Sequence, residues 1–81
     1  MLLDVAVLTP QEIIFEGKAK SVILPGESGV FEVQSFHKRL LSRLISGIVF
    51  VDSESVHIRR GLVMVENNRV TVIAEGVSRE L

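Results

Sequence analysis

The chain has 81 residues, the length of a single small domain, so we expect one domain over residues 1–81. Apolar residues make up 47% of the sequence and charged residues 23%, a composition that excludes an intrinsically disordered chain. Nine basic and ten acidic residues give a net charge of −1, and there is no Cys, so we expect no nucleic-acid partner, no disulfide framework and no thiolate metal site.

The sequence also argues against secretion and membrane insertion. Its longest apolar stretch, 44–51, has eight residues, whereas a transmembrane helix needs about 20. The first ten residues lack the basic start of a signal peptide, and Asp4 falls where the apolar segment of such a peptide would lie. We therefore expect no direct insertion into a membrane.

Short β-strands are expected along the first half of the chain. Residues 3–7 alternate between more and less apolar side chains and end at Thr9-Pro10, which is typical of a half-buried strand. β-branched and aromatic residues predict further strands near 13–15, 22–24 and 30–33. The sequence LPGESGVFEV therefore contains a glycine-rich corner between two strands.

The second half continues this pattern. Residues 48–51 favour a strand and 52–55 a hairpin loop, and Val56 and Ile58 begin a strand that Gly61 interrupts by a bulge or a bend. Asn67-Asn68 then lies between two apolar alternating runs. Because Asn tolerates positive φ, the pair predicts a hairpin with a two-residue primed turn.

The segment 38–47 gives an ambiguous signal. Leu40, Leu41, Leu44 and Ile45 have the spacing of a two-turn helix that ends at Gly47. So short a pattern is equally compatible with an irregular strand and a turn. With the other elements, the chain reads as all-β: a small β-sandwich or flattened barrel of about 8–10 short antiparallel strands.

No constellation of residues points to catalysis. His37 and His57 lie in different expected elements, and no metal-ligand spacing, serine-nucleophile motif or phosphate-binding loop occurs. A biotinyl or lipoyl carrier would need a Lys between two Met residues, and GLVMVENN offers only Met64. An oligonucleotide-binding barrel would need stacking aromatics in a basic groove, and the chain has four Phe, no Tyr and no Trp. We expect no catalytic residue, no metal and no cofactor.

Three stretches in this order, FEGKAKSVILPGESGVFEVQSFHKRLL, GIVFV and RRGLVMVENNRVTVIAE, resemble the amino-terminal domain of the ε subunit of bacterial rotary ATP synthases. The resemblance covers nearly the whole chain. It rests on the order and spacing of these residues: Phe15, Gly17, Val22, Leu24, Pro25, Gly26, Gly29, Phe31, Val33, His37, Leu40, Leu41, Gly47, Gly61, Val65, Val70, Val72 and Ala74.

The resemblance implies a noncatalytic rotor subunit of the central stalk. Such a subunit couples the γ subunit to the ring of c subunits during ion-driven ATP synthesis. It would be peripheral, at the cytoplasmic face of the inner (plasma) membrane, and a monomer within a larger hetero-oligomer. By the same resemblance, the loop formed by Gly26, Glu27, Ser28, Gly29 and Val30 faces the c ring, and Leu8, His37, Leu41 and Ser42 face γ. The corner at 26–30 could equally be a simple turn of the sandwich.

The chain departs from the family pattern in two places. Family members usually continue into two helices that can inhibit hydrolysis; this chain stops at Leu81, so we expect a coupling subunit without that arm. Where the family commonly has Pro-Gly-His-Ala-Pro, residues 35–39 read Ser-Phe-His-Lys-Arg, which leaves the segment 38–46 freer to become helical.

Five basic residues also fall in positions unusual for the family, and they could form a cationic patch or simply a solvated face: Lys38, Arg39, Arg43, Arg59 and Arg60. Two other functions stay open beside the rotor subunit. The first is a free-standing β-sandwich adaptor that binds an unrelated protein, and the more distant one is an enzyme.

Overall fold

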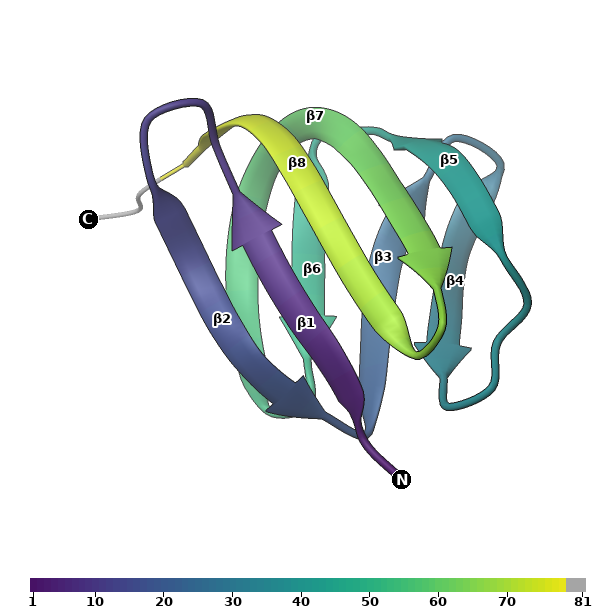
Figure 1. The fold of residues 1–81 in the computed structure, drawn as a ribbon. Coiled ribbons are helices and arrows are strands. Elements are labelled where there is room, and N and C mark those ends of the chain that lie inside the picture. The colour runs from purple at the N-terminus through teal and green to yellow at the C-terminus, as the bar shows by residue number, and fades with distance from the viewer. Residues whose placement is uncertain (79–81) are drawn as a thin grey trace.

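The computed structural model of the protein describes residues 1–78, and these form eight β-strands and no helix (Figure 1). The strands are β1 (Leu3–Leu8), β2 (Ile13–Ala19), β3 (Ser21–Gly26), β4 (Gly29–Gln34), β5 (Leu40–Leu44), β6 (Gly47–Val51), β7 (Glu54–Glu66) and β8 (Arg69–Val77). The predicted all-β class is confirmed.

The strands form a sandwich of two layers that remain joined as one sheet. The first layer has the order β2-β1-β8-β7-β5, and the second contains β4, β3, β6 and the start of β7. Figure 1 shows β1, β2 and β8 in front of β3 and β6. Neighbouring strands are antiparallel, except that β1 runs parallel to β8. A single pairing of Gly26 with Leu44 connects β3 to β5 at the edge of the layers.

The 13-residue strand β7 belongs to both layers because it bends in its middle. Residues 54–58 pair with β6 and residues 61–65 pair with β5. The bend lies at Arg60, whose φ is +39°, and at Gly61. The pairing of β7 with β8 keeps one register through this point, so the predicted interruption at Gly61 is a bend and not a bulge.

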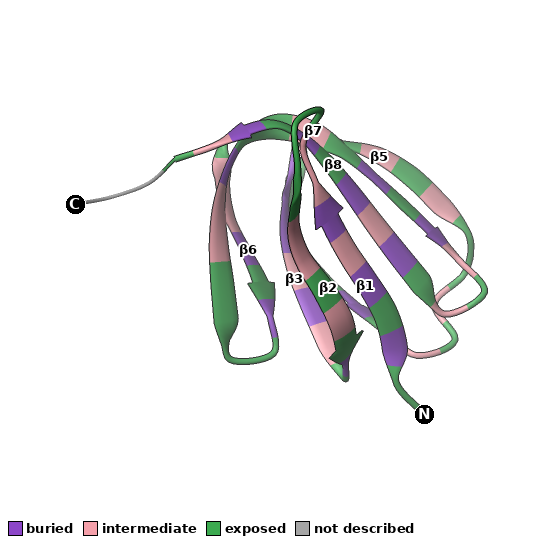
Figure 2. Cartoon of the chain, turned by 60° about the vertical axis from the view of Figure 1, so that its left-hand side comes forward, coloured by how far each residue is buried: buried purple, intermediate pink, exposed green. Residues whose placement is uncertain are grey.

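The core lies between the layers and is built from alternate residues of nearly every strand, as the banding along β1 and β8 in Figure 2 shows. Its members are Leu3, Val5, Val7, Ala19, Val22, Leu24, Val33, Leu44, Val49, Val51, Ile58, Val63, Val65, Val70, Val72 and Ala74. Within residues 1–78 no polar or charged residue is buried. Because burial of each Val or Leu side chain contributes about 1.5–3 kcal/mol, this apolar interior is what holds the layers together.

Two predicted hairpins are confirmed. Asn67 and Asn68 have φ values of +51° and +58°, the primed geometry that the Asn pair predicted. The hairpin between β6 and β7 turns through Asp52 and Ser53, with φ +53° at Asp52. This turn is shorter than the expected loop, because Glu54 and the next residue already pair with β6.

The segment 38–47 contains a strand, so its helical interpretation is wrong and its strand interpretation is right. Leu40 and Leu44 point toward the interior, whereas Leu41 between them is 70% exposed. The available edge of β7 decides the conformation: pairing along 61–65 satisfies the backbone groups of β5. Two isolated helical turns could not offset the cost of helix nucleation.

Candidate protein-binding surfaces

The outer side of the first layer carries a continuous set of apolar side chains from four strands, which we call the apolar face. Strand register places Leu8 beside Ile73, Ile73 beside Leu62, and Met64 beside Leu41. Paired residues on neighbouring strands point to the same side of a sheet, and the residues next to them along each strand point to the opposite side. Here the opposite side is the core. The apolar members of this face are Ala6, Leu8, Leu41, Leu62, Met64 and Ile73; Thr71 lies between Ala6 and Met64, and Arg43 lies beside Leu62.

These side chains are open to solvent to a degree unusual for apolar residues. Leu41 is 70% exposed, and Leu62, Met64 and Ile73 are 43–46% exposed. Ile13, which pairs with Leu8 at the edge of the layer, is 59% exposed. An exposed apolar surface of this kind is typical of a site that binds another protein.

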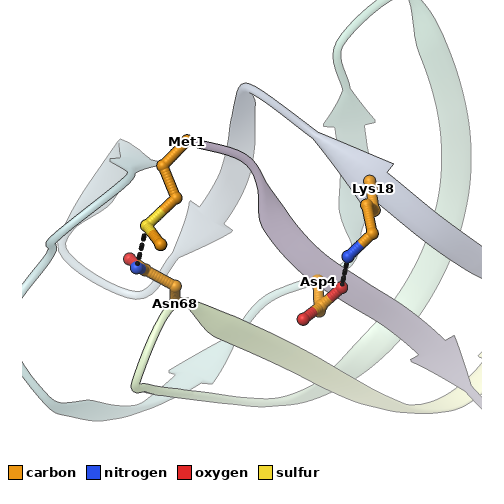
Figure 3. A network of polar contacts seen from close by, with 4 residues as sticks. All are labelled: Met1, Asp4, Lys18 and Asn68. Atoms are coloured by element: carbon orange, nitrogen blue, oxygen red, sulfur yellow. Dashed lines mark hydrogen bonds and ion pairs between the residues drawn. The ribbon is translucent and has the colours of Figure 1, made fainter.

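Ion pairs border the apolar face at both of its ends. At one end Lys18 Nζ lies 2.6 Å from Asp4 Oδ1 (Figure 3), and Arg39 lies 3.1 Å from Glu66. At the other end an Arg60 guanidinium nitrogen lies 3.5 Å from Glu75. An apolar centre with a charged rim is the usual anatomy of a protein interface.

The Asp4 carboxylate shows the electrostatics of this rim. The hydrogen bond from Lys18 and then the Lys18 charge hold the pKa of Asp4 below its ordinary value, and Arg69 on the neighbouring strand acts in the same direction. The Asp4 carboxylate thus stays ionised at neutral pH. Because both groups of the ion pair are exposed, the main effect of the pair is to fix the charge pattern and not to stabilise the fold.

The glycine corner, residues 26–30, is the tight turn between β3 and β4. Gly26 pairs with Gly29, so the chain reverses through Glu27 and Ser28. Gly26 is buried under the Phe31 ring: a Cβ there would lie 2.8 Å from a ring carbon. Gly29 has a φ of +129°, which only glycine adopts freely. Val30 follows with 73% exposure, so the corner presents the Glu27 carboxylate, the short Ser28 side chain and one apolar side chain to solvent.

The structure brings together only part of the set expected to face γ. Leu8 and Leu41 lie on the apolar face. Ser42 pairs with the core residue Val63, so it points to the inner side of the layer and is half-buried. His37 lies in the link between β4 and β5, where its Nδ1 is 2.7 Å from the Lys38 carbonyl oxygen.

The five unusual basic residues do not form one patch. Arg39 and Arg60 lie at opposite ends of the first layer, each beside a carboxylate. Arg59 packs its guanidinium against Gly76. The structure therefore favours solvated, locally paired charges over a common cationic surface.

Besides Ala6, the sequence reasoning missed three members of the apolar face on the last hairpin: Leu62, Met64 and Ile73. The signal for them was present, because the hairpin sequence GLVMVENNRVTVI is apolar at positions of both parities. A strand with one solvated face should alternate with polar residues, so apolar side chains on both sides indicate that both sides are covered.

Within the described part of the chain, no three His, Cys, Asp or Glu residues cluster closely enough to hold a metal ion. The same residues include no helix that could cross a membrane. The features that the structure does offer are a sandwich core, an exposed apolar face with a charged rim, and a rigid glycine corner. These define a small β-sandwich with the surface of a protein-interaction module.

Comparison with known proteins gives the family. Residues 2–80 match the family described as ATP synthase, Delta/Epsilon chain, beta-sandwich domain. The chain belongs to this family, so the resemblance read from the sequence is confirmed.

Individual relatives agree with this assignment. The ATP synthase epsilon chain of Sulfurimonas denitrificans is 39% identical over 79 residues, a match that covers 91% of this chain and 61% of the relative. That of Helicobacter pylori is 34% identical and covers 93% of this chain and 64% of the relative. The chain thus spans a little over three fifths of the length of these relatives.

Solved structures share the fold at low sequence identity. A chain in the central stalk and c-ring structure of the Tetrahymena thermophila mitochondrial ATP synthase matches with a TM-score of 0.79 at 14% identity, over 94% of this chain and 65% of that one. A chain in the Euglena gracilis mitochondrial ATP synthase structure, OSCP/F1/c-ring, matches with a TM-score of 0.81, also at 14% identity, over 95% of this chain and 52% of that one.

Proposed function

We propose that this chain is the noncatalytic β-sandwich part of a rotary ATP synthase ε subunit, which couples the γ subunit to the c ring. Membership of the family supports the assignment, and the curated relatives are named ATP synthase epsilon chain. In this role the chain binds two proteins and catalyses no reaction. It is peripheral, at the cytoplasmic face of the membrane that holds the c ring, and a single copy works within the larger assembly.

The observation that carries the proposal is the apolar face. A joint that transmits torque needs a stable interface, which buries about 1,600 Å² in total and has apolar anchors at its centre. Leu41 on β5 and Ile73 on β8 supply such anchors, because their side chains are 70% and 46% exposed. We assign the apolar face to γ, with Leu8 and Leu41 as contacts and His37 at its margin.

Ser42 is the weakest member of the expected γ-facing set. Its position opposite Val63 directs it to the inside of the layer, so in this proposal it supports the position of Leu41 and does not contact γ itself.

The glycine corner is the proposed contact with the c ring. It joins β3 and β4 of the second layer, and it adjoins the first layer where Gly26 pairs with Leu44 and where Glu27 lines a depression together with Leu62 and Ile73. Its tight geometry fixes the backbone before binding, so docking against a polar loop of another protein costs little conformational entropy. Gly26, Glu27, Ser28, Gly29 and Val30 would form this contact.

The test is a binding measurement between the purified chain and γ from the same organism. We expect a complex at micromolar concentration or tighter, and Leu41→Glu should weaken it by about tenfold or more because it buries a charge at the interface centre. Val30→Ser, an exposed apolar residue outside the apolar face, is the matched control and should bind normally. If the unmodified chain forms no complex, the γ assignment fails and the free-standing adaptor is favoured.

A further inference from the structure

Phe36 has a backbone conformation that bulky residues rarely adopt. Its φ is +66°, in the left-handed region where the Cβ atom crowds the backbone. The Phe36 side chain is also 79% exposed, so burial of the ring within this chain does not offset the strain. A folded chain retains such a residue at a steric cost, and residues of this kind cluster at functional sites.

Neighbouring segments hold Phe36 in this conformation. The backbone N–H of Phe36 donates to Asn68 Oδ1 at 2.6 Å, and Asn68 Nδ2 lies 3.0 Å from the Met1 sulfur (Figure 3). The Ser35 hydroxyl donates to the Met1 carbonyl oxygen at 2.6 Å. The link after β4, the β7–β8 turn and the amino terminus therefore fix the position from which the ring projects.

Phe36 lies near the end of the apolar face that the Arg39–Glu66 ion pair borders. Phe36 and His37 line a depression together with Arg39 and Glu66, the ion pair that borders the apolar face there. Leu41 follows two residues after Arg39 in the sequence. A protein that covers the apolar face and extends past this ion pair would meet the Phe36 ring next.

We propose that Phe36 is an anchor that inserts into an apolar pocket of the protein covering the apolar face. The inference rests on the proposed function for the identity of that protein, which is then the γ subunit. A large aromatic side chain gives much contact area when buried, and a backbone fixed in advance lowers the ordering cost of binding. The strained turn is explained if the Phe36 ring stabilises the complex and not the free chain.

Phe36→Gly tests this, because the affinity for γ should fall while the stability of the isolated chain does not. Glycine accepts φ +66° without strain but is more flexible in the unfolded chain, so the Tm of the isolated variant should be unchanged or up to about 8 °C higher. Its affinity for purified γ should fall by about tenfold or more, as for an anchor residue. Phe36→Trp keeps an aromatic anchor and should retain binding within a few-fold.

Phe50→Ser serves as the control, since Phe50 is also an exposed aromatic residue, at 40%, but lies on β6 of the second layer, outside both proposed binding surfaces. If Phe36→Gly binds γ as tightly as the unmodified chain does, the anchor role of Phe36 is wrong, but the proposed function still stands. A clear fall in Tm for Phe36→Gly would also overturn the anchor role, because the ring would then support the fold itself. If the unmodified chain does not bind γ, the proposed function fails together with this inference.

Discussion

Gly61 is the residue at which an added methyl group meets the least yielding surroundings. A Cβ there would lie 2.4 Å from the Ile73 carbonyl oxygen and 2.9 Å from the Ala74 Cα, both backbone atoms of the paired strand. We expect Gly61→Ala to lower the free energy of unfolding by about 2–3 kcal/mol. Gly17→Ala is the control, since its Cβ would make an ordinary 3.4 Å contact with the Phe15 ring. Urea unfolding measures both, and equal losses would contradict the argument.

Asp4 gives a second prediction for a single residue, this time about the pH dependence of stability. Its folded-state pKa is lowered, first by the Lys18 hydrogen bond and then by the Lys18 charge. The stability from this pair is therefore fully present above the ordinary carboxyl pKa of about 3.9 and is lost as the pH falls through the lowered value. Lys18→Gln should move the Asp4 midpoint upward in an NMR titration of the carboxyl carbon. Lys20→Gln, which removes a lysine that does not contact Asp4, should leave it in place; an unchanged midpoint in Lys18→Gln would refute the assignment.

Among the connections between elements, the Asp52 turn helps to tie the two layers together at one edge. The Asp52 carboxylate accepts hydrogen bonds from the backbone N–H groups of Lys20 and Ser21 at 3.1 Å, where the chain passes from β2 to β3. The Asp52 N–H donates back to the Ser21 carbonyl oxygen at 3.1 Å.

Asp52→Gly keeps the positive φ but removes the carboxylate, so we expect a loss of about 1–2 kcal/mol in the free energy of unfolding. Asp52→Asn keeps one acceptor oxygen and should lose less. Hydrogen exchange adds a local readout, because the amides of Lys20 and Ser21 should exchange faster in Asp52→Gly. Unchanged protection of these two amides would show that the carboxylate does not hold this link.

Strand positions were predictable wherever local chemistry decides them. The Asn67-Asn68 turn follows from the tolerance of Asn for positive φ, and the bend in β7 from Gly61. The β5 strand did not follow from the sequence alone, because Leu40, Leu41 and Leu44 fit a helix equally well. Only the free edge of β7, a long-range partner, decides between the two conformations.

The candidate site was predictable in part, for a related reason. Leu8 and Leu41 were expected to contact a partner by resemblance, and strand register brings them onto one face. Ile73 and Met64 join them there only through the pairing of four strands, which the sequence does not state. The same register separates Ser42 from Leu41, because adjacent strand residues point to opposite sides.

For the whole molecule, the proposed function requires two surfaces that work independently. The two surfaces adjoin where Gly26 pairs with Leu44. Leu41, however, points outward from the first layer, and Val30, three residues before the core residue Val33, points outward from the second. Substitutions at distant sites without shared partners usually act additively. A change on one surface should therefore affect one partner and leave the other.

Leu41→Glu and Val30→Lys separate the two surfaces. We expect Leu41→Glu to weaken binding of γ, and Val30→Lys, at a residue 73% exposed in the glycine corner, to weaken attachment of the preformed chain–γ complex to purified c rings. In the double variant both losses should appear, each within about 0.5 kcal/mol of the single-variant value. Circular dichroism melting of each variant controls for folding. If Val30→Lys lowers γ affinity as strongly as Leu41→Glu does, the surfaces are not separate, because a change at the corner must then reach γ through direct contact or through distortion of the sandwich.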